Sequence, residues 1–228
     1  MADHPNVVKL VDLFETQASS YIVLELLQGG DLFQYLKARS FKLTEHRVRQ
    51  LAKQLAEGIA YLHSLGIVHR DIKLENIMMT DTTEESSPKI IDFGLSKMIG
   101  PNEKSKDPFG TLGYVAPEIL LRKPYSFSCD VWSLGCVVYA MMSGALPFDS
   151  RDSKSIITHT IESELKFEQP CWKNCSNDFI DFLSKTLTKN QHKRPSINEI
   201  LRHRWFKTES RDKQSRGNKQ RIRIFWLV

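Results

Sequence analysis

The sequence predicts an α+β chain that begins with a short β-hairpin and continues into a mainly helical body. Two apolar stretches, 7–14 and 21–27, are rich in β-branched and aromatic residues and flank a polar run, which is the pattern of a hairpin. Further along, apolar residues recur at three- and four-residue steps, as they do on one face of an α-helix. We therefore expect a small β start followed by many helices.

The first two helices are predicted by their end signals. Two glycines interrupt the second apolar stretch, and Asp31 is suited to cap a short helix over 32–38. Thr44 can cap the next helix, in which apolar residues recur as far as Leu62. Gly66 follows the last turn and supplies a helix stop.

The rest of the chain is predicted to contain short strands and three more helices. Residues 67–97 read as short strands and loops. The segment 126–144 is apolar nearly all round, which predicts a buried helix. Two further helices are expected over 177–187 and 196–206, each with Ser or Asn near its start.

Composition and charge narrow the function classes. Hydrophobic residues make up 41% and charged residues 26%, as in an ordinary soluble protein, and no apolar run is long enough for a transmembrane helix. The net charge of +5 arises entirely in residues 207–228, where seven Lys or Arg meet two Asp or Glu. Because residues 1–206 are then balanced, we expect no nucleic-acid surface and a flexible basic tail over 207–228.

The cysteines and the N-terminus bear on location. There are four cysteines and no C-x-x-C pair, so no zinc site is predicted. Cys129 and Cys136 are seven residues apart on one predicted helix and read as small buried hydrophobic residues. Reduced thiols, together with no apolar leader in residues 1–9, predict a cytoplasmic protein, with the nucleus as the alternative.

Three ordered motifs carry the chemistry. They read His-Arg-Asp-Ile-Lys-Leu-Glu-Asn at 69–76, Asp-Phe-Gly at 92–94 and Ala-Pro-Glu at 116–118. In this order and with these gaps they resemble the catalytic loop, the metal-binding loop and the end of the activation segment of eukaryotic protein kinases. The resemblance covers residues 4–206 and implies a protein-kinase-like fold, here mainly its helical C-terminal lobe.

The resemblance implies a role for each polar residue of these loops. Asp71 is expected to accept the proton of a substrate hydroxyl, and Lys73 to neutralise charge on the transferred phosphoryl group. Asn76 and Asp92 supply the oxygen ligands that Mg²⁺ prefers, so ATP and Mg²⁺ are the expected cofactors. Lys73 and Thr111 are typical of Ser/Thr kinases, which implies protein substrates that carry Ser or Thr.

Residues 24–27 resemble the kinase hinge that binds adenine. The resemblance gives the hydrogen bonds to backbone groups of Glu25 and Leu27, and it makes Leu24 the gatekeeper. Met78 matches the apolar floor beneath adenine.

Two acidic residues match positions near the ribose or near basic substrate side chains. Asp31 and Glu75 therefore predict a preference for basic residues before the target Ser or Thr. The alternative for Asp31 is that it only caps a helix.

Other matching residues are expected to support the active site. Glu118 is expected to pair with Arg194, and Asp130 to accept backbone hydrogen bonds from the catalytic loop. His69 and Phe93 are expected to stack.

One pair of residues predicts how the activation segment is ordered. Arg70 lies beside the catalytic aspartate, where many kinases place a phosphorylated residue against it. Counting back four residues from Thr111, the corresponding position is Asp107. Asp107 can pair with Arg70 without modification, so a loop ordered without an upstream kinase is predicted. The alternative is that Asp107 is a solvated loop residue and Ser105 is the phosphorylated residue.

The chain is most similar to the calcium/calmodulin-regulated kinase group, which includes calcium-dependent kinases. The stretches 21–25, 29–33 and 147–148 are typical of that group. No D-x-D-x-D-G loop of an EF-hand occurs, so calcium control is not predicted and calmodulin is left open as a partner.

The chain departs from the family pattern at its start. It contains no G-x-G-x-x-G, and no lysine precedes Lys9, so the phosphate-anchoring lysine has no candidate. We expect 1–206 to be a partial kinase domain, with 1–27 as N-lobe remnant and hinge and 28–206 as the C-lobe. Intact catalytic residues favour a fragment of an active kinase that is slow by itself. The alternative is a noncatalytic binding or scaffold module.

Overall fold

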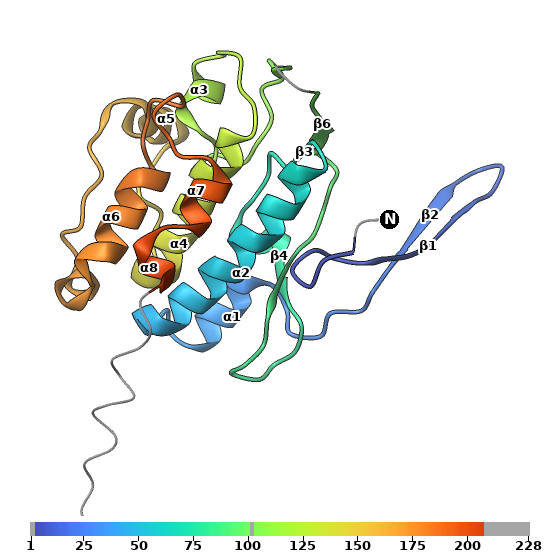
Figure 1. The fold of residues 1–228 in the computed structure, drawn as a ribbon, viewed down its shortest axis with the longest axis horizontal. Helices are drawn as coiled ribbons and strands as arrows, with labels where there is room; N and C mark the ends of the chain where they lie inside the picture. Colours follow the sequence, from blue (N-terminus) through green and yellow to red (C-terminus); the bar gives the residue numbers. More distant parts are fainter. Residues whose placement is uncertain (1–2, 101–102, 208–228) are drawn as a thin grey trace, which may run out of the picture.

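The computed structural model describes residues 3–100 and 103–207, and within them it shows a β-hairpin attached to a mainly helical body (Figure 1). The strands form three antiparallel two-stranded sheets, β1–β2, β3–β6 and β4–β5. The predicted α+β class is confirmed. The described strands are β1 (Leu10–Glu15), β2 (Ser20–Leu24), β3 (Ile67–Val68), β4 (Ile77–Met79), β5 (Pro88–Ile90) and β6 (Lys97–Met98).

The helices lie mostly after the hairpin, as the periodicity predicted. The α-helices are α1 (Leu32–Ala38), α2 (Glu45–Ser64), α3 (Pro117–Leu120), α4 (Ser128–Ser143), α5 (Ser153–Glu162), α6 (Asn177–Thr186), α7 (Ile197–Leu201) and α8 (Arg204–Lys207). Two 3₁₀ turns are added, η1 (Leu74–Asn76) and η2 (Pro170–Asn174).

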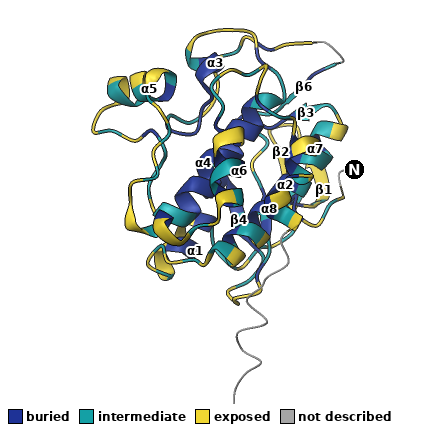
Figure 2. Cartoon of the chain, turned by 60° about the vertical axis from the view of Figure 1, so that its left-hand side comes forward, coloured by how far each residue is buried: buried dark blue, intermediate teal, exposed yellow. Residues whose placement is uncertain are grey.

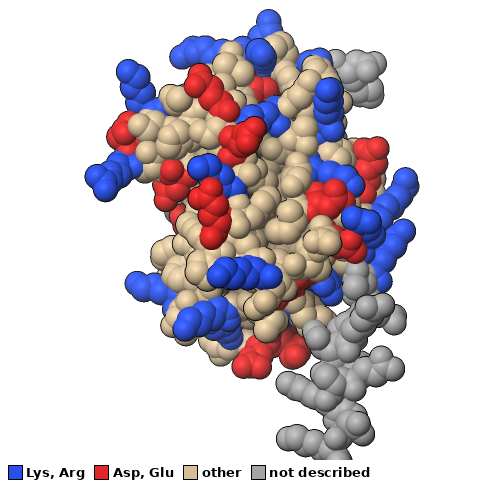
Figure 3. Space-filling model, turned by 90° about the vertical axis from the view of Figure 1, so that its left-hand side faces the viewer, with Lys and Arg blue, Asp and Glu red and all other residues tan. Residues whose placement is uncertain are grey.

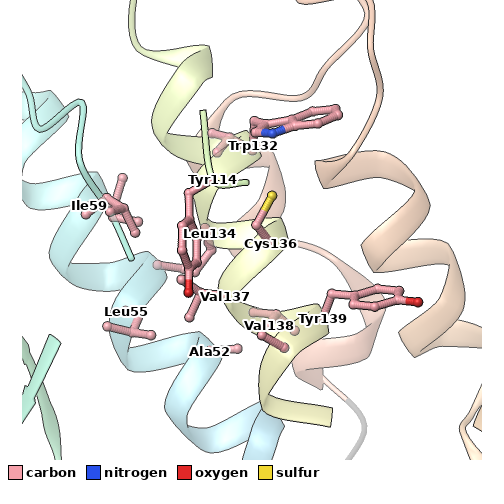
Figure 4. Close-up of a cluster of buried hydrophobic side chains, with 14 of the residues drawn as sticks. Ala52, Leu55, Ile59, Tyr114, Trp132, Leu134, Cys136, Val137, Val138 and Tyr139 are labelled. Carbon is pink, nitrogen blue, oxygen red and sulfur yellow. The ribbon is translucent and has the colours of Figure 1, made fainter. Parts of the chain in front are cut away.

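The core lies between α2 and α4. Every residue of α4 from Cys129 to Met141 is buried, which confirms the helix without a polar face. Figure 4 shows Leu55 and Ile59 of α2 beside Val137 of α4. These two packed helices support the loops that carry the motifs.

Local signals start and stop the helices where they were predicted. Asp31 accepts a hydrogen bond from the Gln34 amide at 2.7 Å and caps α1. Thr44 caps α2 in the same way, and Gly66 follows its end with a φ of +74°, a conformation that favours glycine.

The hairpin formed by β1 and β2 extends away from the helical body (Figure 1). Leu13 pairs with Ile22, and Phe14 with Tyr21. All four side chains are exposed. The hairpin is confirmed, with shorter strands than the apolar stretches suggested.

One helix prediction was wrong, and the helices α3 and α5 were missed. The helix expected over 196–206 is two helices, because α7 ends at Leu201 and two residues separate it from the start of α8 at Arg204. The helix α5 was not predicted. Of its residues only Thr160 is buried, so the apolar periodicity that reveals a packed helix is weak there (Figure 2).

The prediction for two of the cysteines is confirmed, while most of the basic tail lies outside the described residues. Cys129 and Cys136 are buried as expected, and burial raises the pKa of both thiols. On the face in Figure 3, basic side chains are interspersed with acidic ones. No helix among the described residues is long and apolar enough to span a membrane. The predicted tail over 207–228 lies outside the described residues except for Lys207.

Candidate active site

The catalytic loop is anchored to the helical body by Asp130, which lies in the first turn of α4. Its carboxylate accepts hydrogen bonds from the backbone amides of His69 and Arg70, each at 2.9 Å, as the sequence predicted. His63 Nε2 lies 2.9 Å from the same carboxylate. Burial alone would raise the pKa of Asp130, but the bonds from His63 and the loop more than offset this, so its pKa is lowered. Asp130 therefore stays charged and holds the loop.

Asp71 lies at the centre of a hydrogen-bond cluster. Thr111 Oγ1 donates to Asp71 Oδ1 at 2.6 Å, while Lys73 Nζ and Asn76 Nδ2 approach Oδ2 at 2.9 and 2.8 Å. Lys73 also donates to Thr111 Oγ1 at 2.9 Å. Burial by itself would raise the pKa of Asp71, but these partners lower it by more than burial raises it. The net pKa is lowered, so the carboxylate is an ionised acceptor at neutral pH.

The two expected metal ligands are brought to the same end of the β4–β5 sheet. The Ile91 amide donates to the backbone oxygen of Asn76 at 3.0 Å, which joins the two loops. Asn76 donates both bonds of its amide nitrogen to Asp71, which leaves its side-chain oxygen for another partner. Asp92 is exposed and adopts a φ of +58°.

These residues fit a magnesium ion better than a transition metal. Asn76 and Asp92 offer oxygen donors, and no group of three or more His, Cys, Asp or Glu within 3–100 and 103–207 could hold a metal. Mg²⁺ usually keeps several waters and takes only one or two carboxylates together with substrate phosphates. A sparse oxygen site is therefore the appropriate donor set.

The expected contact between His69 and Phe93 is present but edge-on. The ring centroids are 5.2 Å apart with an interplanar angle of 63°, so the rings do not stack. The His69 ring also makes a polar contact, with Nε2 lying 3.0 Å from the backbone oxygen of Ile91.

The hinge, residues 24–27, has one backbone group already occupied. The Glu25 amide donates to the Lys9 oxygen at 3.0 Å, so only its carbonyl is available to adenine. No described residue accepts a hydrogen bond from the Leu27 amide. Leu24, the expected gatekeeper, is 45% exposed.

Asp31 and Met78 lie side by side. Residues 28–31 add to the β4–β5 sheet, with the Gly29 amide donating to the Met79 oxygen at 3.0 Å and with Asp31 opposite Met78. A Cβ on Gly29 would lie 2.6 Å from that of Met79, so only glycine fits this approach. The floor residue and the acidic residue therefore line the same strand pair, although the Asp31 carboxylate caps α1.

Glu75 is exposed at the end of the catalytic loop. Its charge, added to the effect of burial, raises the pKa of Tyr114. No described contact joins Glu75 to Asp31.

Arg70 and Asp107 form the contact that the sequence predicted. Arg70 Nη1 lies 3.0 Å from Asp107 Oδ2. Lys97 lies 3.3 Å from the same oxygen, and the Ser105 hydroxyl donates to it at 2.8 Å. The bond from Ser105, then those from Arg70 and Lys97, lower the pKa of Asp107. Ser105 itself is 1% exposed and pairs through its backbone with Tyr125.

Glu118 and Arg194 also pair as predicted. Two parallel hydrogen bonds of 2.7 and 2.9 Å join the guanidinium to the carboxylate, and both side chains are buried. Arg194 donates further to the backbone oxygens of Ser128 and Thr188, each at 2.9 Å. The pair ties the end of the activation segment to the start of α4 and to the loop after α6.

Sequence reasoning missed His63, Lys89 and Lys97. His63 contacts Asp130, Lys89 contacts Glu25 and Lys97 contacts Asp107. For the two lysines the sequence offered one signal of a functional position: Lys97 follows the Asp-Phe-Gly motif by three residues, and Lys89 precedes it by three. Which acid each would meet depends on tertiary packing.

Comparisons with known proteins agree with this geometry. The model of the protein kinase domain matches residues 1–206. CDPK-related kinase 8 of Arabidopsis thaliana is 36% identical over 212 residues, which cover 93% of this chain and 35% of that protein. The chain thus spans about a third of the length of this curated relative. The chain belongs to the protein kinase family.

Proposed function

We propose that this domain transfers the γ-phosphoryl group of ATP to Ser or Thr of protein substrates. The observation that carries the proposal is the Asp71 carboxylate, which is held by Lys73, Thr111 and Asn76 at 2.6–2.9 Å. Phosphoryl transfer depends on positioning and charge neutralisation more than on covalent catalysis, and this cluster supplies both.

Asp71 orients the substrate hydroxyl and accepts its proton. A carboxylate with a lowered pKa is a weak base, so its main contribution is to hold the hydroxyl in line until the proton becomes acidic late in the transfer. Lys73 bridges Asp71 and Thr111, which places its ammonium next to the position of the transferred group.

Asn76 and Asp92 would hold magnesium, which neutralises phosphate charge when ATP is bound. The free carbonyl of Glu25 and the amide of Leu27 would bind the adenine edge, with Leu24 as gatekeeper and Met78 beneath the ring. Lys73 and Thr111, which are typical of Ser/Thr kinases, contact the Asp71 carboxylate at 2.9 and 2.6 Å, and this favours Ser and Thr over Tyr as the target.

Asp31 and Glu75 would favour basic residues before the target residue. Their support is limited to charge and position, since Asp31 already caps α1. A library of Ser peptides with Arg, Ala or Glu at each upstream position measures this preference. Equal rates with Arg and Ala at every position would contradict it.

A phosphotransfer assay tests the main proposal. Because the 228 residues contain no Gly-rich loop, we expect the chain alone to be slow, and the assay also includes a chimera with the small lobe of a related kinase placed before His4. The chimera should phosphorylate Ser and Thr peptides but not matched Tyr peptides. Asp71→Asn should reduce the rate by about a hundredfold or more.

The control for this assay is a variant of similar chemistry far from the site, Asp178→Asn in α6. Equal rates in the Asp71→Asn and parent chimeras would contradict the assignment of Asp71. A chimera that binds ATP and peptide yet transfers no phosphate would favour the alternative of a noncatalytic binding module.

A further inference from the structure

The strand that leads into the metal-binding loop also reaches the hinge. Lys89 lies in β5, and Asp92 follows three residues later. The Lys89 ammonium lies 2.6 Å from Glu25 Oε1, although 64 residues separate the two in sequence. Only 13% of the Lys89 side chain and 26% of the Glu25 side chain are exposed. The two halves of the proposed nucleotide site are thus joined by one ion pair.

Glu25 has a second set of contacts at the same place. The Lys9 amide donates to Glu25 Oε1 at 2.7 Å, and the Glu25 amide donates to the Lys9 oxygen at 3.0 Å. Burial by itself would raise the pKa of Glu25, but the contacts with Lys89 and Lys9 lower it by more, so the net pKa is lowered. The carboxylate is therefore charged at neutral pH and able to attract the ammonium.

The Lys89 side chain extends from a well-fixed strand. On one edge β5 pairs with β4, where Lys89 faces Met78. On the other edge the Ile90 amide and carbonyl bond to Asn6 and Val8 at 2.9 Å each. The hinge is bonded on one side to Lys9 at Glu25, and its next residue, Leu26, is 80% exposed.

We infer that Lys89 is a positioning residue that fixes the hinge, residues 24–27, for adenine. The inference rests on the proposed ATP-dependent function and goes beyond it by naming a residue that touches neither substrate nor metal. Adenine is bound by backbone groups, so its affinity depends on how well those groups are held before binding. The ammonium of Lys89 holds them through the Glu25 side chain.

The experiment replaces the ion pair and measures the hinge directly. The variants are Lys89→Met, Lys89→Arg, Glu25→Gln and the Lys89→Met/Glu25→Gln pair, with Lys53→Met in α2 as a control at an exposed lysine. Hydrogen exchange of the amides of residues 24–27 is followed in the 228-residue chain. ATP affinity is then measured by calorimetry on the same proteins.

The expected result is a pattern. Lys89→Met should speed hinge exchange and weaken ATP binding by about five- to tenfold, the scale of the net contribution of a typical hydrogen bond. Lys89→Arg should keep most of the protection of the hinge amides and most of the ATP affinity. Glu25→Gln should resemble Lys89→Met, and the double variant should be no worse than either single variant. Exchange in α2 and α4 should not change.

Two outcomes would overturn the inference. One is hinge exchange in Lys89→Met equal to that of the parent chain. The other is additive effects of Lys89→Met and Glu25→Gln, which would mean that the two side chains act independently. If the 228-residue parent chain bound no ATP, the chimera assay would still decide the proposed function, and the exchange rates alone would decide whether Lys89 fixes the hinge.

Discussion

Two arginine–carboxylate pairs hold opposite ends of the segment between the metal-binding loop and α4, and they differ in burial. Arg194 and Glu118 are joined by two bonds, with side chains 0% and 3% exposed. Arg70 and Asp107 are joined by one bond, and the Asp107 side chain is 44% exposed. Both side chains of the first pair are shielded from solvent, while solvent reaches the Asp107 carboxylate of the second. We therefore expect the first pair to maintain the fold and the second to adjust the active site.

Breaking the buried pair should have the largest effect. Arg194→Met leaves the Glu118 carboxylate buried without its partner, and the expected loss of stability is about 3–5 kcal/mol. Chemical denaturation of the variant and the parent chain measures this loss. A variant with an unchanged midpoint would show that solvent reaches Glu118 after all.

Breaking the pair of Arg70 with Asp107 should change activity while leaving the fold intact. Asp107→Asn removes the charge that Arg70 meets, so the activation segment should be less ordered and the chimera's phosphotransfer rate about tenfold lower. Thermal melting should differ little from the parent. If melting dropped as far as in Arg194→Met, the distinction between the two pairs would fail.

The pH response should separate a carboxylate from a phosphate at this position. The pKa of Asp107 is lowered, so its contribution is present above the ordinary value of 3.8 and is lost only as pH falls through the lower folded value. Loop order should therefore be constant between about pH 5.5 and 8. A phosphoryl group would lose charge near pH 6. Exchange of residues 105–115 at several pH values provides the measurement.

Ser105→Ala should have the smallest effect. The Ser105 hydroxyl donates to Asp107 at 2.8 Å, but Arg70 and Lys97 remain on the same oxygen. We expect a change in rate of less than about twofold, measured as for Asp107→Asn. An effect larger than that of Asp107→Asn would point to Ser105 as the regulated residue.

Local signals in the sequence were sufficient for most of the helices, while the motif contacts followed from the family resemblance. Thr44 predicted the start of α2, and the apolar residues of 126–144 predicted a buried helix. The contacts of Asp130, Glu118 and Arg194 were expected from the resemblance and are present.

The missed features depend on long-range packing or weak local patterns. α5 is largely exposed and has little apolar periodicity. The break between α7 and α8 at His203 occurs where the ring packs against Phe182 and bonds to Asp181, contacts that a local pattern does not contain. The ion pair of Lys89 with Glu25 spans 64 residues and is fixed by how β5 meets the hinge.

The measurement that tests the account most directly is the activity of the chimera made in bacteria and shown by mass spectrometry to carry no phosphate. The account predicts transfer to Ser and Thr peptides without prior modification, because Asp107 already pairs with Arg70. The same preparation of Asp107→Asn should be about tenfold slower, and Asp107→Glu should recover most of the rate. An unmodified parent that is inactive until a second kinase phosphorylates Ser105 would contradict it.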